Sequence, residues 1–198
     1  MTSARPQRYW HRFIADDGTW RKDSSEREYR PVPQDLAVFR SGLGREAGAV
    51  PKFWPYYTTA VTDDDAYRDR LPDELHAEHA ALALFGRHQQ SKDTPMHRRG
   101  VGLGAAWLVL RRRTDKFSAD ALDRKLTVAA ASTSVPVLRT RLRGLIDQLR
   151  TVDQPLDYDR LLCDLRDWSD PSRRDAVRQR WALGYRIWST DPAAEPEN

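Results

Sequence analysis

The chain has 198 residues, of which 39% are hydrophobic and 31% charged, with a net charge of +4 and one cysteine. A single cysteine excludes an internal disulfide and a zinc site built from several cysteines. The longest apolar window, residues 100–110, is shorter than the roughly 20 residues that a membrane-spanning helix needs, and the N-terminus has no apolar signal core. We therefore expect a soluble, cytoplasmic protein with one ordinary domain or two small bundles and no membrane partner.

The first half of the chain is predicted to be helical, because alternating β-branched runs and Asn-Gly turns are absent. Asp35 is expected to cap a short helix, and glycines and prolines between residues 42 and 55 break the chain after it. A longer helix is predicted from Pro72 to about Gln90, with the stripe Leu75, His79, Leu82 and Gly86. A polar loop at residues 89–99 then leads into a buried helix over residues 101–113.

The second half has clearer helix signals. The predicted helix starts are at Ser118, Ser134, Asp157 and Asp170, all good capping residues. After Ser134, leucines recur at i, i+4, i+7 and i+11, within ~60° of one another, which predicts one buried seam. That seam consists of Leu138, Leu142, Leu145 and Leu149. The two following helices are expected to bury Tyr158, Leu161, Leu162, Leu165 and Trp168, and then Val177, Trp181, Tyr185 and Trp188.

These patterns predict an all-α fold, a helical bundle with two small helical subdomains. Residues 1–116 are expected to form an N-terminal helical subdomain and residues 117–190 a C-terminal helical bundle. Residues 191–198, with two prolines, are expected to be a disordered tail.

Positive charge is concentrated in the second half. Residues 91–190 hold 20 Lys or Arg against 12 Asp or Glu, whereas residues 1–90 hold 13 against 14. Arginine predominates, and its forked guanidinium matches phosphate geometry, although a GC-rich genome would also enrich arginine.

Three arginines, Arg139, Arg143 and Arg150, are placed about 100–140° from Leu138, in a row beside the leucine seam. A solvated surface explains any single arginine, but a row of like charges favours an anionic partner, most often nucleic-acid phosphate. The residues predicted to bind nucleic acid are Arg98, Arg99, Arg111, Arg112, Arg113, Lys116, Arg124, Lys125, Arg139, Arg143 and Arg150.

Other short motifs give little support to a cofactor, metal or catalytic site. Residues 100–105 fit a loose dinucleotide-binding pattern but lack a preceding strand, so their small side chains are expected to allow close helix packing. His76 and His79 share a helix face without an evident third metal ligand, and His79 is expected to be a hydrogen-bonded core histidine. Residues 63–65 are interpreted as a loop or helix cap, and Cys163 as buried. We therefore predict no catalytic residue, no metal and no cofactor.

Several segments resemble the CasB family, the small subunits of the type I-E CRISPR surveillance complex Cascade. They are His88-Gln89-Gln90-Ser91, Pro95-Met96-His97-Arg98, Gly100-Val101-Gly102-Leu103-Gly104-Ala105 and, later, Leu156-Asp157-Tyr158-Asp159-Arg160-Leu161 with Asp167-Trp168 and Trp181. The resemblance covers residues 70–190. It implies an all-α, non-enzymatic subunit, present in two copies, that contacts other Cascade subunits, the guide RNA and the target DNA.

The resemblance also implies particular binding residues. Arg124-Lys125 match a basic pair of the family, and the run from Leu138-Arg139 to Leu142-Arg143 matches its leucine–arginine helix. Ala105 stands where many relatives have arginine, so Arg98, Arg99 or Arg111 is expected to supply that contact instead.

Two other functions stay open. A helix-turn-helix DNA-binding regulator suits the helices and the charge, but it needs a recognition helix that presents polar side chains to base edges. Leucine seams flanked by arginines suit phosphate better. An enzyme such as a metal-dependent nuclease is less favoured, because no carboxylate–histidine cluster stands out. The favoured prediction is a non-catalytic subunit that stabilises guide RNA and opened target DNA in antiviral defence.

Overall fold

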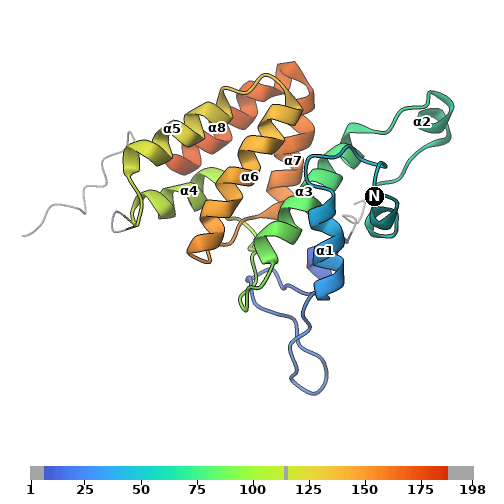
Figure 1. Ribbon diagram of the computed structural model, residues 1–198, viewed down its shortest axis with the longest axis horizontal. Helices are drawn as coiled ribbons and strands as arrows, with labels where there is room; N and C mark the ends of the chain where they lie inside the picture. Colours follow the sequence, from blue (N-terminus) through green and yellow to red (C-terminus); the bar gives the residue numbers. More distant parts are fainter. Residues whose placement is uncertain (1–6, 114–115, 187–198) are drawn as a thin grey trace, which may run out of the picture.

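The computed structural model describes residues 7–113 and 116–186, which form an all-α structure (Figure 1). In chain order the elements are η1 (Tyr9–Arg12), α1 (Pro33–Ser41), η2 (Pro51–Tyr56), α2 (Asp63–Tyr67), α3 (Asp73–Gln89), α4 (Leu103–Arg111), α5 (Ala119–Ala130), α6 (Val135–Thr151), α7 (Tyr158–Ser169), η3 (Pro171–Arg173) and α8 (Arg174–Tyr185). Within the described residues, extended pairing is limited to three isolated bridges. The predicted all-α helical bundle is confirmed. None of the helices in the described part is long and apolar enough to cross a membrane.

α3 is the central helix of the bundle. It packs against α1 on one side and against α6 and α7 on another (Figure 1). Its buried residues point in every direction around the helix axis, as expected of a helix enclosed by others. The predicted stripe is therefore only part of its buried surface. Gly86 lets α1 approach, because a Cβ atom there would lie 2.5 Å from the Cβ of Phe39.

A buried carboxylate in α3 fastens the N-terminal segment to the bundle. Glu78 accepts hydrogen bonds from the backbone N–H groups of Thr58 and Thr59, both at 2.9 Å, and lies 2.9 Å from the Arg8 guanidinium. Burial alone would raise the pKa of Glu78, but the threonine hydrogen bonds and the charge of Arg8 lower it below its ordinary value. Glu78 is thus a satisfied structural anion.

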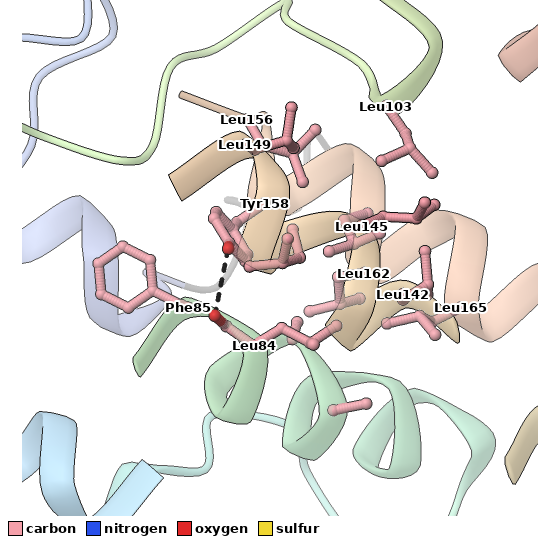
Figure 2. Close-up of a cluster of buried hydrophobic side chains, with 14 of the residues drawn as sticks. Leu84, Phe85, Leu103, Leu142, Leu145, Leu149, Leu156, Tyr158, Leu162 and Leu165 are labelled. Carbon is pink, nitrogen blue, oxygen red and sulfur yellow. Dashed lines mark hydrogen bonds between the residues drawn. The ribbon is translucent and has the colours of Figure 1, made fainter. Parts of the chain in front are cut away.

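The leucine seam of α6 forms much of the core. Leu138, Leu142, Leu145 and Leu149 are all buried, as predicted. Figure 2 shows Leu142, Leu145 and Leu149 in one cluster with side chains of α3 and α7. At the centre of this cluster, the Tyr158 hydroxyl donates a hydrogen bond to the Leu84 carbonyl at 3.3 Å.

One hydrophobic cluster includes buried residues from both sides of the expected domain boundary, from η1 to α8. The division into residues 1–116 and 117–190 stays a prediction. Residues 114–115 lie outside the described residues, as do Trp188 and the expected tail at residues 191–198.

The glycine-rich stretch before and within α4 has a packing role. A Cβ atom on Gly104 would lie 2.0 Å from the Trp181 carbonyl oxygen, and one on Gly184 would lie 2.7 Å from the Ala105 nitrogen. The two glycines therefore let the backbones of α4 and α8 touch. This confirms that the small residues serve close helix packing.

The predicted helix starts are mostly confirmed. The side chains of Ser118, Asp157 and Asp170 accept hydrogen bonds from the backbone of the turns that follow them. Ser134 stands at the N-cap of α6, but its side chain makes no capping hydrogen bond.

Two interpretations were wrong. Asp35 does not cap its helix, because α1 begins two residues earlier at Pro33, and the Asp35 carboxylate instead accepts hydrogen bonds from the Tyr9 and Tyr56 hydroxyls at 2.8 and 2.6 Å. Cys163 is exposed rather than buried, because α7 turns the adjacent Leu161 and Leu162 toward the core and leaves the next position on the other face.

The seam predicts a clear difference between neighbouring substitutions in α6. Leu142→Ala is expected to lower the free energy of unfolding by about 2–5 kcal/mol, because it leaves a cavity at a position with no exposed surface. Arg143 is the next residue and its side chain is exposed, so Arg143→Ala is expected to change the free energy of unfolding by less than about 0.5 kcal/mol. Urea denaturation followed by circular dichroism measures both, and equal losses would contradict the assignment of faces.

His88 is a fully buried histidine in α3. Its Nδ1 lies 3.0 Å from the Tyr158 hydroxyl, and its Nε2 has no hydrogen-bond partner among the described protein atoms. Burial, reinforced by the positive charge of Arg150, lowers the pKa of His88 to about 3. The neutral form is therefore the folded form.

The buried histidine predicts loss of stability in mild acid. An unfolded histidine takes up a proton near pH 6.5, whereas folded His88 does not, so stability falls as the pH drops below about 6.5. Between pH 7.5 and 5, His88 is expected to contribute a loss of about 2 kcal/mol, which urea titrations at both pH values measure. His88→Gln should reduce this pH dependence more than the control His76→Gln, a substitution at a half-buried surface position.

Candidate nucleic-acid interface

The corner between α4 and α5 carries most of the predicted binding residues. Arg111 and Asp123 fix this corner: the Arg111 Nε lies 3.0 Å from the Asp123 carboxylate, which also accepts a hydrogen bond from the Tyr185 hydroxyl. The hydrogen bond to Asp123 raises the pKa of Arg111 above its ordinary value. Arg111 is therefore a structural cation that joins α4 to α5.

Around this ion pair the basic side chains point into solvent. α5 buries Leu122, Leu126 and Ala129, which leaves Arg124 and Lys125 exposed on its outer face. Arg112, Arg113 and Lys116 are exposed at the end of α4 and in the turn after it. Among the described residues, no carboxylate lies within ion-pair distance of Arg113, Lys116, Arg124 or Lys125.

The predicted row on α6 is present, but its three arginines differ in availability. Arg139 is half-buried and its Nη2 lies 2.5 Å from the Glu46 carboxylate, in the loop after α1. The hydrogen bond from Arg139 lowers the pKa of Glu46, which keeps that carboxylate charged. Arg150 donates a hydrogen bond to the Gln90 carbonyl at 2.7 Å. Arg143 alone of the three is exposed and has no partner among the described residues.

α5 and α6 lie side by side (Figure 1), and Arg143 lies about 200° around α6 from Arg141, on the flank that faces away from α5. Arg141 links the two helices by donating hydrogen bonds to the Val128 carbonyl and the Ser132 hydroxyl. We call the exposed cations of these elements the basic surface; its members are Arg113, Lys116, Arg124, Lys125 and Arg143.

The remaining predicted pair, Arg98 and Arg99, lies elsewhere. Both are exposed in the loop that precedes α4, whereas Arg113 follows its last turn, and the nine-residue helix between them is about 13 Å long. Arg99 pairs with Asp16 at 2.7 Å. The aliphatic part of Arg98 lies against Gly18. The structure therefore separates this pair from the basic surface.

The structure brings together one cluster that the sequence did not reveal. Donor atoms of His11, His97 and Asp159 all lie within 4.8 Å of one another. Two histidines and a carboxylate can hold a metal, provided that each histidine offers a lone pair and donates its other N–H to an acceptor. Since His11 and Asp159 are 148 positions apart, no spacing in the sequence announces the cluster.

The hydrogen bonds around the cluster do not fit a metal. The Nδ1 of His11 accepts the backbone N–H of Arg8 at 3.2 Å, and its Nε2 lies 2.8 Å from the Asp159 carboxylate. The Nδ1 of His97 likewise accepts the backbone N–H of Tyr158 at 3.1 Å. In a neutral imidazole this leaves the proton of His97 on Nε2, and the Nε2 of His11 also lies 3.1 Å from the Trp10 indole nitrogen, so neither ring keeps a free lone pair for a metal. The cluster instead joins η1 to the start of α7.

The other histidine motif is also structural. The Tyr57 hydroxyl lies 2.8 Å from the Nδ1 of His79, and the Gly42 carbonyl lies 3.1 Å from its Nε2. Burial lowers the pKa of His79. The prediction of a hydrogen-bonded core histidine is confirmed. His76 lies 3.6 Å from the Glu46 carboxylate.

Comparison with known proteins gives a consistent family match. Residues 35–185 match the family model described as CRISPR-associated protein Cse2. The crystal structure of CasB from Thermobifida fusca is 30% identical, with a TM-score of 0.60 over 77% of this chain and 84% of that one. No curated protein sequence matches the chain.

Two less similar structures support the fold alone. A Cse2-family protein from Thermus thermophilus is 24% identical, with a TM-score of 0.55 over 77% of this chain and 85% of that one. A chain of a structure described as a CRISPR RNA-guided surveillance complex is 21% identical, with a TM-score of 0.56 over 78% of this chain and 82% of that one.

Proposed function

Because this chain belongs to the Cse2 family of CRISPR-associated proteins, also named CasB, we propose that it is a non-catalytic subunit of an RNA-guided surveillance complex. In that complex it stabilises the guide RNA and the opened target DNA through the basic surface, beside other subunits and a second copy of itself. The observation that carries the proposal is the set of exposed cations without carboxylate partners among the described residues, on α5, α6 and the segment that follows α4.

The distribution of ion pairs supports a phosphate-binding role for this surface. Elsewhere on the described surface, arginines such as Arg99, Arg166 and Arg180 lie within 3.0 Å of a carboxylate. The basic surface lacks such anions among the described residues, so its positive potential is left for an external one. A nucleic-acid backbone supplies regularly spaced negative charges that match this need.

The geometry favours backbone contacts over base reading. A helix-turn-helix regulator must lay one helix into the major groove and present several polar side chains to base edges. α6, which follows the short turn after α5, buries its leucine seam in the bundle, packs mainly against α3 and α5, and keeps only its outer side free. Long arginine and lysine side chains on that side suit phosphates, which position a protein without specifying sequence.

A phosphate-binding surface predicts a strong salt dependence. For about five contacts to a single strand, a plot of the logarithm of the association constant against the logarithm of salt concentration should have a slope of about −3.5. Fluorescence anisotropy with a labelled single-stranded oligonucleotide at several salt concentrations measures the slope. Two oligonucleotides of different sequence should give nearly equal affinities. A slope close to zero would contradict phosphate binding.

Charge reversal tests which arginines are responsible. Arg124→Glu combined with Arg143→Glu removes two open cations and adds two repulsive charges, so affinity for opened target DNA on the reconstituted complex should fall at least tenfold, or about 1.4 kcal/mol. The fold should survive because both side chains are exposed and neither is in an ion pair with a described residue.

The matched control reverses two exposed arginines outside the basic surface, Arg68 and Arg173, which changes the net charge equally. If the control pair loses as much affinity as the test pair, binding depends on net charge and not on this surface. If neither pair loses affinity at one fixed salt concentration, the basic surface is only solvated and the subunit acts through protein contacts.

A further inference from the structure

A large concavity of the described chain lies away from the basic surface. A groove of about 970 Å³ follows α7 and is closed by α8, the first turn of α4 and residues of the N-terminal segment. No member of the basic surface lines it. It lies at the opposite end of α4, because Leu103 and Gly104 border it whereas Arg113 follows the last turn.

The groove offers apolar surface to an occupant. Leu103, Leu162 and Trp181 line it as buried side chains, and Leu183 stands at its border with 64% of its surface exposed. A leucine exposed to this extent beside other apolar groups is typical of a surface that another molecule covers.

In two ion pairs that line the groove, the arginine is much more exposed than its carboxylate partner. Arg160 is 65% exposed, while Asp157, at 4.0 Å from it, is 4% exposed. Arg180 is 46% exposed, while its partner Asp164, at 2.8 Å, is 9% exposed. In both pairs the carboxylate lies deep and the guanidinium group reaches outward. An occupant therefore meets positive charge at the rim formed by α7 and α8, whereas in the Arg8–Glu74 pair, which also lines the groove, the carboxylate is the more exposed partner.

We propose that this groove binds an acidic segment of a partner protein that also carries leucine or tryptophan side chains. The carboxylates of the segment pair at the rim with Arg160, whose nearest carboxylate is 4.0 Å away, and its apolar side chains cover Leu183 and enter between α4 and α7. The proposal does not depend on nucleic-acid binding, since it concerns different residues at the other end of α4.

A peptide fits this chemistry better than a nucleic-acid strand. Phosphates follow one another along a strand at every nucleotide, so some would face Asp159 and Asp167, which also line the groove. A strand would also leave the leucines uncovered. In an acidic segment that alternates with apolar residues, the carboxylates are spaced by side chains that need the apolar surface.

The chain carries its own reporter for occupancy. Cys163 is its only cysteine, is exposed and lines the groove. A synthetic peptide in which glutamates alternate with leucine and tryptophan, at about 1 mM, is expected to slow alkylation of Cys163 by N-ethylmaleimide at least about fivefold in the full chain. The same peptide with lysine for glutamate, or with serine for leucine and tryptophan, should protect at least about fivefold less.

Variants locate the protection. Arg160→Glu and Leu183→Ser should each reduce protection by the acidic peptide at least about threefold, measured as the ratio of alkylation rates without and with peptide. The control Arg68→Glu, at a site with 67% exposure just after α2, should leave the ratio unchanged. Because each ratio compares one variant with itself, a change in the intrinsic reactivity of the thiol does not affect it.

Four outcomes would overturn the proposal. The first is no protection by the acidic peptide, and the second is better protection of Cys163 by an oligonucleotide than by the peptide. Faster alkylation upon dilution of the protein alone would identify a second copy as the occupant. Faster alkylation after removal of residues 187–198 would identify the chain's own C-terminal segment.

Discussion

Enclosure of α3 is the constraint on which the rest of the structure depends. Its buried residues point to all sides, so the helix is stable only where other elements cover it completely. α1 covers one side through the close approach at Gly86, and α6 and α7 cover another. The buried carboxylate of Glu78 in α3 also needs partners, and these are the Arg8 guanidinium and the backbone N–H groups of Thr58 and Thr59. The N-terminal segment is thereby part of the core.

Covering α3 determines where the positive charge goes. α6 must turn its leucines inward, so its arginines are confined to the flanks and the outer side. The contacts of each arginine there depend on the neighbouring element. Arg139 forms an ion pair with Glu46, Arg150 donates a hydrogen bond to the Gln90 carbonyl, and Arg143 is exposed to solvent. Between α4 and α5, likewise, Arg111 forms an ion pair with Asp123 and is not available to a ligand. The open cations are those that have no carboxylate or carbonyl within reach among the described residues.

Local patterns explain how much of this could be predicted from sequence. The seam on α6 and the caps at Ser118 and Asp157 depend on residues within one or two turns, so periodicity and capping chemistry identify them. The partners of Arg139 and Arg150 are 93 and 60 positions away, and the contacts of His11 with Asp159 span 148. Such pairs arise from the packing of helices, which no window of sequence contains. The direction of Cys163 was misjudged because neighbouring leucines suggested burial, although adjacent helical positions differ by about 100°.

The pairing of Arg139 with Glu46 limits what that arginine can contribute to binding. A phosphate that contacts Arg139 must displace a carboxylate already 2.5 Å away, and the released Glu46 would remain nearby as a repulsive charge. Arg143 has no such competitor among the described residues, so its full attraction is available to a ligand. Although the sequence resemblance predicted a binding role for both arginines, physical availability ranks Arg143 above Arg139. The primary role that the contacts support for Arg139 is to hold the loop after α1 against α6, which keeps the cover of α3 in place.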